Sequence, residues 1–190
     1  MFRELLAQEF GRFAKLTSEQ LNQLEAHYQL LSTWNRRMNL TRITELEDVV
    51  RLHYCESLFV ALQLPAGPLR IVDVGSGAGF PGIPIAVLRP ECLVSLVDSH
   101  QRKAVFLREG ARGLPNVRVV AARAEELRTR FDWMVSRAVA PKDVFPLIAR
   151  NIAVLRGERD VAALGPAWNV REVPWGKGRY LAMFHGEPST

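Results

Sequence analysis

The chain has few cysteines and few lysines among its 190 residues. Its two cysteines, Cys55 and Cys92, form no Cys-x-x-Cys pair and lie near no group of histidines, so neither a disulfide framework nor a zinc site is expected. No apolar run approaches the ~18 residues that cross a bilayer, so no membrane partner is expected. Arg3, Glu4 and Glu9 interrupt the start of the chain, which argues against a secretory signal. These absences indicate a cytoplasmic protein that binds no metal.

Positive charge is in modest excess. The chain has 25 Lys and Arg against 20 Asp and Glu, a formal net charge of +5 and a sequence pI of about 9.7. An excess of this size favours an anionic partner such as nucleic acid, although a solvated surface with a basic bias would give the same numbers. Lysine supplies only four of the 25 basic residues, which can also reflect genome composition.

The first third of the sequence has a helical pattern. Leu21, Leu24, Tyr28 and Leu31 recur at spacings of three and four, which gives one apolar face, and residues 17–20 read as an N-cap with a capping box. A second helix is expected to begin near residue 45. We therefore expect an N-terminal helical extension over residues 1–64 and a core over residues 65–190, packed as one compact unit.

Short apolar strands then alternate with helical segments. This alternation indicates an α/β fold with a mostly parallel sheet and helices on both faces. The chain ends in a pattern typical of an antiparallel hairpin, around Pro174 and Gly176. The predicted strands cover residues 69–74, 93–97, 117–120 and 131–135, with the hairpin at 170–173 and 179–184, and the predicted helices cover 82–89, 101–112 and 124–128.

A glycine-rich loop follows the first strand of this pattern. The segment from Asp73 to Gly79 reads acid-x-Gly-x-Gly-x-Gly, and glycines at such a loop let a ligand approach the backbone closely. The dinucleotide template Gly-x-Gly-x-x-Gly fails, because its third glycine would fall on Phe80. The loop instead resembles the first motif of Rossmann-like methyltransferases, which lies against S-adenosylmethionine. The predicted cofactor contacts here are Asp73, Gly75, Ser76, Gly77, Gly79 and Phe80.

Asp98 ends the second predicted strand, about twenty residues after the loop, where a carboxylate can accept hydrogen bonds from both ribose hydroxyls. Asp98 or Ser99 could instead cap the following helix. Ala124 and Glu125 follow the third strand and Arg137 follows the fourth, so all four segments should meet at one edge of the sheet. We count Asp98, Ser99, Ala124, Glu125 and Arg137 as further candidate cofactor contacts.

Several motifs together resemble the glucose-inhibited division protein B family, also called ribosomal RNA small subunit methyltransferase G. The most specific is Gly-Phe-Pro-Gly-Ile-Pro over residues 79–84. The other matching segments are Met38–Thr41, Arg51–His53 with Ser57, Asp73–Gly79, Val97–Ser99, Arg102–Lys103 with Phe106–Leu107, and Val135–Ala138.

The resemblance implies a bacterial enzyme with the Rossmann-like class I methyltransferase fold. It would transfer a methyl group from S-adenosyl-L-methionine to N7 of a guanine in the decoding region of 16S rRNA. The expected partner is 16S rRNA or the 30S subunit, and we expect a monomer. Arg137 and Arg123 are the candidate catalytic residues, and Arg102, Lys103, Arg123 and Lys142 are the candidate RNA-binding residues.

The sequence departs from the family in two places. Glu56 stands where the family's His-x-x-Asp-Ser motif has aspartate. The family also carries Leu-Lys-Gly after its fifth strand, and the nearest match we identify is Ala163–Gly165, which lacks the lysine. If that lysine is needed, Arg159 or Lys177 would have to replace it.

Three other functions are alternatives to N7 methylation of 16S rRNA. One is methyl transfer by the same fold to another nucleic acid, a protein or a small molecule. A second is a non-catalytic RNA-binding relative, and a third is a nicotinamide dehydrogenase, which Phe80 disfavours. Within methyl transfer, no acid or Asn followed by Pro-Pro-aromatic supports an exocyclic amine target, and no suitably placed cysteine supports pyrimidine C5. Trp34, Phe80 and Trp133 could stack on an unpaired base, but core packing is the preferred interpretation of the two tryptophans and packing beside the cofactor that of Phe80.

Overall fold

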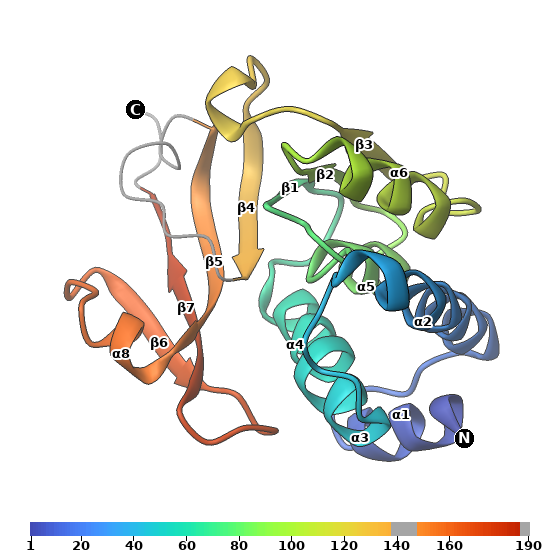
Figure 1. Cartoon of the computed structure of the whole chain (residues 1–190). Helices are drawn as coiled ribbons and strands as arrows, with labels where there is room; N and C mark the ends of the chain where they lie inside the picture. Colours follow the sequence, from blue (N-terminus) through green and yellow to red (C-terminus); the bar gives the residue numbers. More distant parts are fainter. Residues whose placement is uncertain (138–147, 187–190) are drawn as a thin grey trace.

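A single seven-stranded sheet organises the computed structural model, which describes residues 1–137 and 148–186 (Figure 1). The strand order is β3-β2-β1-β4-β5-β7-β6. The first five strands pair in parallel, whereas β7 runs antiparallel to both β5 and β6. This confirms the predicted mostly parallel sheet with a C-terminal antiparallel hairpin. The strands are β1 (Arg70–Val74), β2 (Leu93–Val97), β3 (Val117–Val120), β4 (Phe131–Arg137), β5 (Ala149–Gly157), β6 (Trp168–Glu172) and β7 (Arg179–Phe184).

The order of the strands reverses between β1 and β4. From β1 the chain winds outwards through β2 to β3, and it then returns to place β4 on the other side of β1. In open α/β sheets, ligands bind outside the carboxyl ends of the strands at such a switch point. Val74 and Arg137, the last residues of β1 and β4, therefore mark the edge where a site is expected.

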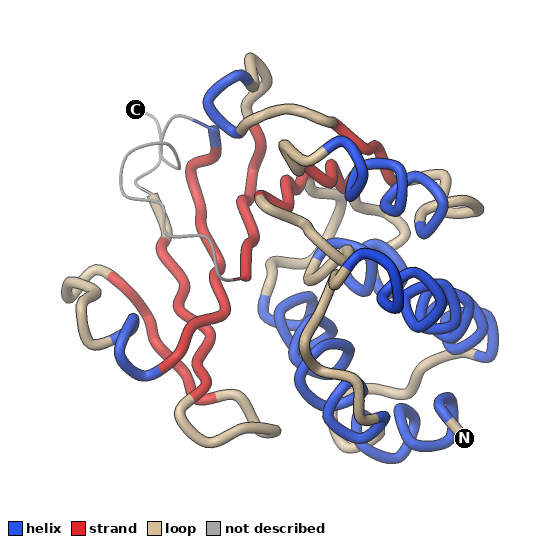
Figure 2. The backbone as a smooth tube through the Cα atoms, in the orientation of Figure 1, coloured by secondary structure: helices blue, strands red, loops and turns tan. Residues whose placement is uncertain are grey.

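Helices gather around the first strands of the sheet, as the blue tube of Figure 2 shows. The long helix α2 contacts α1, α5 and α6. The helical segments are α1 (Phe2–Phe10), α2 (Ser18–Met38), α3 (Leu46–Val49), the π-helix η1 (Val50–Cys55), α4 (Glu56–Gln63), α5 (Gly82–Leu88), α6 (Gln101–Gly110), the 3₁₀ turn η2 (Ala124–Glu126) and α8 (Glu158–Val161). The helix predicted over residues 124–128 is thus a single 3₁₀ turn.

Local sequence explains how α2 begins. The Thr17 hydroxyl accepts a hydrogen bond from the Gln20 backbone N–H at 3.2 Å, and the Gln20 side chain accepts one from the Thr17 N–H at 2.9 Å. This is the predicted capping box, which satisfies two donors that the first turn leaves unpaired. The helix buries Leu24, His27 and Leu31 on one face.

A π-helical stretch lies between α3 and α4, so one continuous helical segment runs from Leu46 to Gln63. π-helical stretches are rare in proteins, and those that do occur often lie at functional sites. This one buries the side chains of His53 and Tyr54 together. Both residues contact the candidate site described below.

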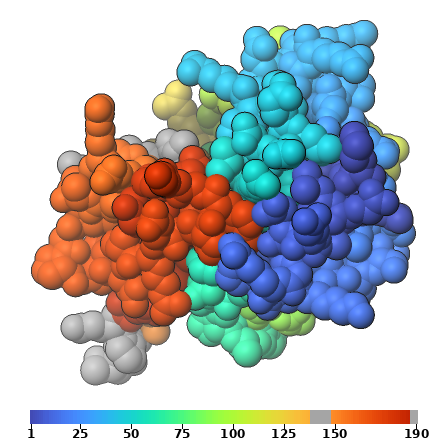
Figure 3. Space-filling model, turned by 90° about the horizontal axis from the view of Figure 1, so that it is seen from below, coloured from blue at the N-terminus to red at the C-terminus, as the bar shows by residue number. Residues whose placement is uncertain are grey.

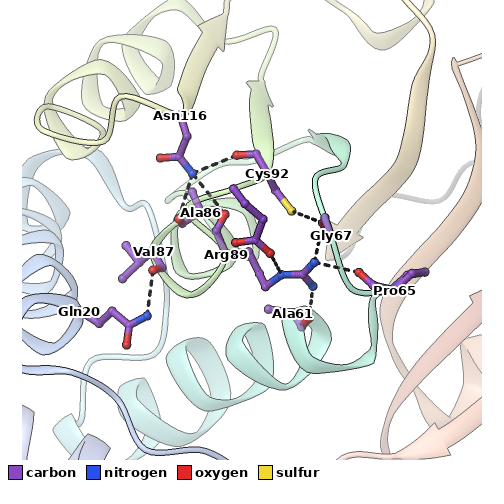
Figure 4. Close-up of polar contacts among 10 residues, drawn as sticks. Gln20, Ala61, Pro65, Gly67, Ala86, Val87, Arg89, Cys92 and Asn116 are labelled. Carbon is purple, nitrogen blue, oxygen red and sulfur yellow. Dashed lines mark hydrogen bonds and ion pairs between the residues drawn. The ribbon is translucent and has the colours of Figure 1, made fainter.

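Side chains from neighbouring segments cap the carboxyl end of α5, the helix that follows the glycine loop (Figure 4). The Asn116 amide donates to the carbonyls of Ala86 at 3.0 Å and Cys92 at 3.1 Å, and the Gln20 amide donates to Val87 at 3.3 Å. The Ala86 and Val87 carbonyls belong to the last turn of α5, which leaves them unpaired, whereas Cys92 lies just before β2. Arg89 makes similar contacts at the end of α4 and in the segment after it: its guanidinium donates to the carbonyls of Ala61, Pro65 and Gly67.

The N-terminal helices share one hydrophobic cluster with the sheet, from Phe2 through to Met183. Trp175, in the loop between β6 and β7, lies 5.0 Å from the Phe13 ring and 6.1 Å from the Phe10 ring. Figure 3 shows the part of the chain coloured orange and red, towards the C-terminus, in contact with the blue N-terminal helices. The predicted segments 1–64 and 65–190 therefore pack closely against each other.

Candidate active site at the carboxyl edge of the sheet

The glycine loop turns sharply through backbone conformations that favour glycine. Gly75, Gly77 and Gly79 have φ angles of 68°, 59° and 86°. The Gly75 and Ser76 N–H groups both donate to the Val97 carbonyl, at 2.9 and 3.0 Å, which ties the loop to the end of β2. A Cβ on Gly79 would lie 2.5 Å from Cδ1 of Ile83. The loop therefore requires glycine for its conformation and for its packing.

Asp73 supports the loop from below. Its Oδ2 accepts hydrogen bonds from the Ser76 hydroxyl at 2.7 Å and from the Gly82 N–H at 2.9 Å. The side chain is fully buried, and burial raises its pKa to about 6. Its Oδ1 is also buried and has no hydrogen-bond partner among the described residues. Asp73 and Ser76 thus shape the loop, and their predicted contact with a cofactor stays a prediction.

A cleft of about 490 Å³ opens beside the loop, at the carboxyl ends of β1, β2 and β4. This volume lies within the usual range for small-molecule sites. The sequence-predicted residues that line it are Gly75, Asp98, Ser99, Lys103, Arg123, Ala124, Glu125 and Arg137. Four segments that are far apart in the sequence therefore meet at one edge, as the strand pattern predicted.

Asp98 forms part of the cleft wall. Its Oδ2 accepts a hydrogen bond from the Gly77 N–H at 3.0 Å, and its Oδ1 accepts one from the His100 N–H at 2.9 Å. The N-cap of α6 is His100, and it makes no side-chain capping bond. Nδ1 of the exposed His100 ring also lies 3.2 Å from Oδ1. Each carboxylate oxygen can accept two hydrogen bonds, so Oδ2 keeps one free acceptor position. Asp98 can therefore fix the loop and still accept a hydroxyl donor from a ligand at Oδ2.

Arg137 is anchored where β4 ends. Its Nη1 donates to the Leu52 carbonyl at 3.2 Å and to Nδ1 of His53, and its guanidinium lies 5.2 Å from the centre of the Phe80 ring. Burial lowers the pKa of Arg137 to about 10. The side chain thus stays cationic at neutral pH and is held in one position on the cleft wall.

The hydrogen bonds of His53 define its tautomer. Because Nδ1 accepts from Arg137, the ring proton must be on Nε2, which lies 2.8 Å from the Thr41 hydroxyl. Burial, together with the charge of Arg137, lowers the pKa of His53 to about 2. His53 is therefore neutral and positions Arg137.

Phe80 lies in an aromatic cluster beneath the loop. Its buried ring stacks on His53 at 4.8 Å and meets the edges of Tyr54 at 5.0 Å and His27 at 5.2 Å. This cluster connects the π-helix and α2 to the glycine loop. The predicted contact between Phe80 and a cofactor stays a prediction.

His27 is a residue of this region that sequence reasoning left without a role. Its Nε2 lies 3.0 Å from the Ala78 carbonyl and its Nδ1 lies 2.8 Å from the Tyr54 hydroxyl. Because a carbonyl can only accept, Nε2 donates to Ala78 and Nδ1 accepts from Tyr54. Burial lowers the pKa of His27 to about 4. Its position on the apolar face of α2, between Leu24 and Leu31, was the signal that could have identified it.

Glu56, the departure from the family's aspartate, forms a bidentate ion pair. Its two carboxylate oxygens accept from Nε and Nη2 of Arg179, the latter at 2.6 Å. This contact raises the pKa of Arg179. The longer acidic side chain therefore joins α4 to the first residue of β7.

The observed end of the fifth strand gives a different position for the Leu-Lys-Gly motif than the sequence alone suggested. β5 ends in Leu155, Arg156 and Gly157, whereas Ala163–Gly165 lies beyond α8. The match at Ala163–Gly165 therefore does not directly follow the fifth strand. Leu155, Arg156 and Gly157 give a second match to the motif at the end of β5, with a cation in place of the lysine. The motif was missed because β5 itself was not predicted.

The remaining predicted residues lie elsewhere. Arg102 lines a second groove between α2 and α6, and Lys142 lies outside the described residues. Trp133 is fully buried, which confirms its core-packing alternative. Burial raises the pKa of the Cys55 and Cys92 thiols, so neither is an activated nucleophile.

Two kinds of feature are absent from residues 1–137 and 148–186. These residues contain no group of three His, Cys, Asp or Glu side chains that could hold a metal ion. Over the same ranges, every helix is too short or too polar to cross a membrane.

Comparison with solved structures identifies the class of fold. A magnesium protoporphyrin IX methyltransferase from Synechocystis PCC 6803, solved with bound SAH, superposes with a TM-score of 0.57 at 13% identity, over 86% of this chain and 98% of that one. This likeness confirms the predicted Rossmann-like methyltransferase fold.

Sequence comparison is more specific. The chain is 42% identical over 134 residues to a ribosomal RNA small subunit methyltransferase G from Roseiflexus sp. (strain RS-1), which covers 66% of this chain and 57% of the relative. It is 40% identical over 148 residues to one from Chromobacterium violaceum, which covers 76% of this chain and 70% of the relative. The sequence model of the GidB family, rRNA small subunit methyltransferase G, matches residues 20–169. The chain therefore belongs to the rRNA small subunit methyltransferase G family.

Proposed function

We propose that the protein transfers the methyl group of S-adenosylmethionine to N7 of a guanine in 16S rRNA. The observation that carries this proposal is the cleft beside the glycine loop, where Asp98 and Arg137 face one space in a chain of this family. The substrate is the 16S rRNA of the small subunit, in its decoding region, either free or assembled in the 30S particle. The protein acts as a monomer in the bacterial cytoplasm.

The residues of the cleft suit this cofactor. Oδ2 of Asp98 has unused acceptor capacity for one ribose hydroxyl, and Oδ1 can accept a second when the exposed His100 ring turns away. The loop brings its backbone close to the ligand at Gly75. Ala124 and Glu125, which also line the cleft, would lie against the adenine end. The bound cofactor supplies an electrophilic methyl group, and every other requirement falls on the protein and the RNA.

The protein needs no general base for this reaction. Guanine N7 has an in-plane lone pair that can attack a sulfonium methyl without losing a proton. Correct placement can account for roughly 7–11 kcal/mol of barrier reduction. Arg137, cationic and held by His53 and Leu52, orients the guanine or a neighbouring phosphate. Arg123 and Lys103, at the rim of the cleft, hold the RNA backbone.

The test is transfer of an isotope-labelled methyl group from S-adenosylmethionine to three substrates: 30S subunits, deproteinised 16S rRNA and a tRNA control. We expect label in 16S rRNA, in one or both of its forms, and none in tRNA. Calorimetric binding of S-adenosylhomocysteine is measured in parallel. Cofactor binding without label in any RNA would point to another methyl acceptor or to a non-catalytic RNA-binding relative.

A further inference from the structure

A second groove lies beside the cofactor cleft, between the carboxyl end of α2 and the first turns of α6. It encloses about 500 Å³. Its lining combines one large aromatic side chain, exposed aliphatic surface and three arginines. The lining residues are Thr33, Trp34, Arg36, Arg37, Met38, Arg102 and Val105.

The charged side chains that line this groove are all positive. None of the described residues lining it is acidic. Within the described ranges, Arg36, Arg37 and Arg102 make no hydrogen bond or ion pair, in contrast to Arg51, Arg89 and Arg179, which are all paired. Three unpaired guanidinium groups around one groove favour an anion with several oxygens, such as a phosphodiester chain.

The floor of the groove is an aromatic ring held in place. Trp34 packs against Phe106 in an edge-to-face arrangement, with ring centres 5.7 Å apart, while its side chain stays partly exposed and lines the groove. Val105, which is 47% exposed, adds an apolar wall. An indole fixed in this way is a platform on which an unpaired nucleobase can stack. A double helix offers no free base face to such a platform.

The groove and the cleft share the first turn of α6. Arg102 lines the groove, and the next residue, Lys103, lines the cleft. Successive residues on a helix point about 100° apart, so the two sites lie on different sides of one turn. A single RNA strand can pass over this turn from one site to the other.

We propose that this groove binds an unpaired nucleotide of the RNA substrate, with its base on Trp34 and its phosphates at Arg37 and Arg102. This inference rests on the proposed function for the identity of the RNA, and it adds a second contact point outside the methyl-transfer cleft. The groove holds a nucleotide that is not methylated. It thereby selects RNA in which the target guanine lies next to a single-stranded segment.

The test compares matched variants in RNA binding and in methyl transfer. The pair Arg37→Ala with Arg102→Ala removes two cations from the groove, and the control pair Arg108→Ala with Arg112→Ala removes two exposed cations from the far end of α6. Trp34→Leu removes the stacking face, whereas Trp34→Phe keeps one. Urea unfolding verifies that each variant is folded.

Fluorescence anisotropy then measures binding of a labelled single-stranded RNA and of its duplex. Trp34→Leu should weaken single-strand binding by roughly 5- to 100-fold and leave duplex binding unchanged, with Trp34→Phe close to the wild type. The groove pair should reduce the slope of log K against log salt by about 1.4, since each single-strand phosphate contact contributes about 0.7. In methyl transfer these variants should raise KM while kcat and the affinity for S-adenosylhomocysteine stay unchanged.

Three results would overturn the proposal. The control pair could weaken RNA binding as much as the groove pair, which would reduce the effect to net charge. Trp34→Leu could bind the single strand as the wild type does. The groove variants could bind RNA normally and lose activity on 30S subunits alone, which would make the groove a contact for a ribosomal protein. Absence of methyl transfer in the wild type would contradict the proposed function only, because the binding measurements do not depend on it.

Discussion

His53 accepts a hydrogen bond from the guanidinium of Arg137, which lies 84 residues later in the chain. The π-helix η1 carries the histidine, and the last residue of β4 is the arginine. Because Thr41 holds the other ring nitrogen, the acceptor faces Arg137 without rotation of the ring. The cation at the edge of the cleft is thus positioned before any ligand binds.

Loss of this acceptor should impair both stability and turnover. In His53→Phe the ring can still stack on Phe80, but a buried donor of Arg137 is left unpaired, which costs about 1–3 kcal/mol of unfolding free energy. We also expect kcat for methyl transfer to fall, because Arg137 is no longer fixed. Urea unfolding and steady-state kinetics measure the two effects. His53→Asn places an amide oxygen near the former Nδ1 and should recover part of both. Equal activity in the phenylalanine variant and the wild type would show that Arg137 needs no positioning.

Asp98 should account for much of the cofactor affinity. Asp98→Asn removes the negative charge and one acceptor, so the affinity for S-adenosylhomocysteine should fall by about 10- to 100-fold, the range for hydrogen bonds to a charged group. Isothermal titration calorimetry measures this affinity. The matched control is Asp132→Asn, because Asp132 also accepts a backbone N–H, that of Arg70 at 2.7 Å, but at the opposite edge of the sheet. Equal losses in both variants would mean that Asp98 acts on the fold and not on the ligand.

The stability of the fold should fall in acid because two histidines are buried and neutral. The pKa values of His27 and His53 fall to about 4 and about 2 from an ordinary 6.5, so below pH 6.5 the unfolded chain takes up protons that the native protein does not. The stability that these residues contribute above pH 6.5 is therefore lost as the pH falls towards their native values. Asp73 has the opposite effect on stability. Its pKa rises from 3.8 to about 6 on folding, so between these pH values the native protein holds a proton that the unfolded chain has released.

For these three groups together, the balance between pH 4 and 6 is one proton, which corresponds to a loss of about 1.4 kcal/mol of unfolding free energy per pH unit of acidification. His27→Gln should lower the measured slope by about 1.4 kcal/mol per unit, and Asp73→Asn should raise it by about 1.4 kcal/mol per unit. Urea unfolding at a series of pH values measures the slopes. Identical slopes in all three proteins would contradict the assignment of neutral, buried histidines.

Glu56 and Arg179 should be strongly coupled. Arg179→Met leaves the buried carboxylate of Glu56 without its partner, which should cost about 3–5 kcal/mol. Glu56→Gln should cost less, because the side chain of Arg179 is one third exposed and can reach water. The double variant Glu56→Leu with Arg179→Met should recover much of the loss. A double-mutant cycle in urea measures the coupling, and additive losses would show that the pair contributes nothing beyond its separate side chains.

Much of the fold could be predicted because its signals are local. The strands β1 to β4 and the hairpin follow from short apolar runs, and the capping box at Thr17 marks the start of α2. The strand β5 was missed because its buried stretch, Ile152–Leu155, is only four residues long and fits a helix as well as a strand. The turn η2 was predicted as a longer helix for a different reason: it has no buried residue, so no apolar periodicity defines its length.

The site was predictable only in part, for a related reason. The glycine loop and Asp98 could be identified because their conformation and spacing are properties of a short segment. The pairs that hold the site together join residues far apart in the sequence: Arg137 with His53, Tyr54 with His27 across 27 residues, and Arg179 with Glu56 across 123. Such pairs depend on how the elements pack, and no local pattern shows which partners meet.

Methyl transfer to guanine N7 in 16S rRNA is the proposed activity from which the other expectations follow. The most direct measurement treats RNA that carries the labelled methyl group with cleavage chemistry specific for N7-methylguanine, and it locates the break by primer extension. We expect one strong break at a single guanine of 16S rRNA, which depends on the enzyme and on S-adenosylmethionine and is lost in Arg137→Ala. Labelled RNA that resists this cleavage, or breaks that persist unchanged in Arg137→Ala, would contradict this expectation.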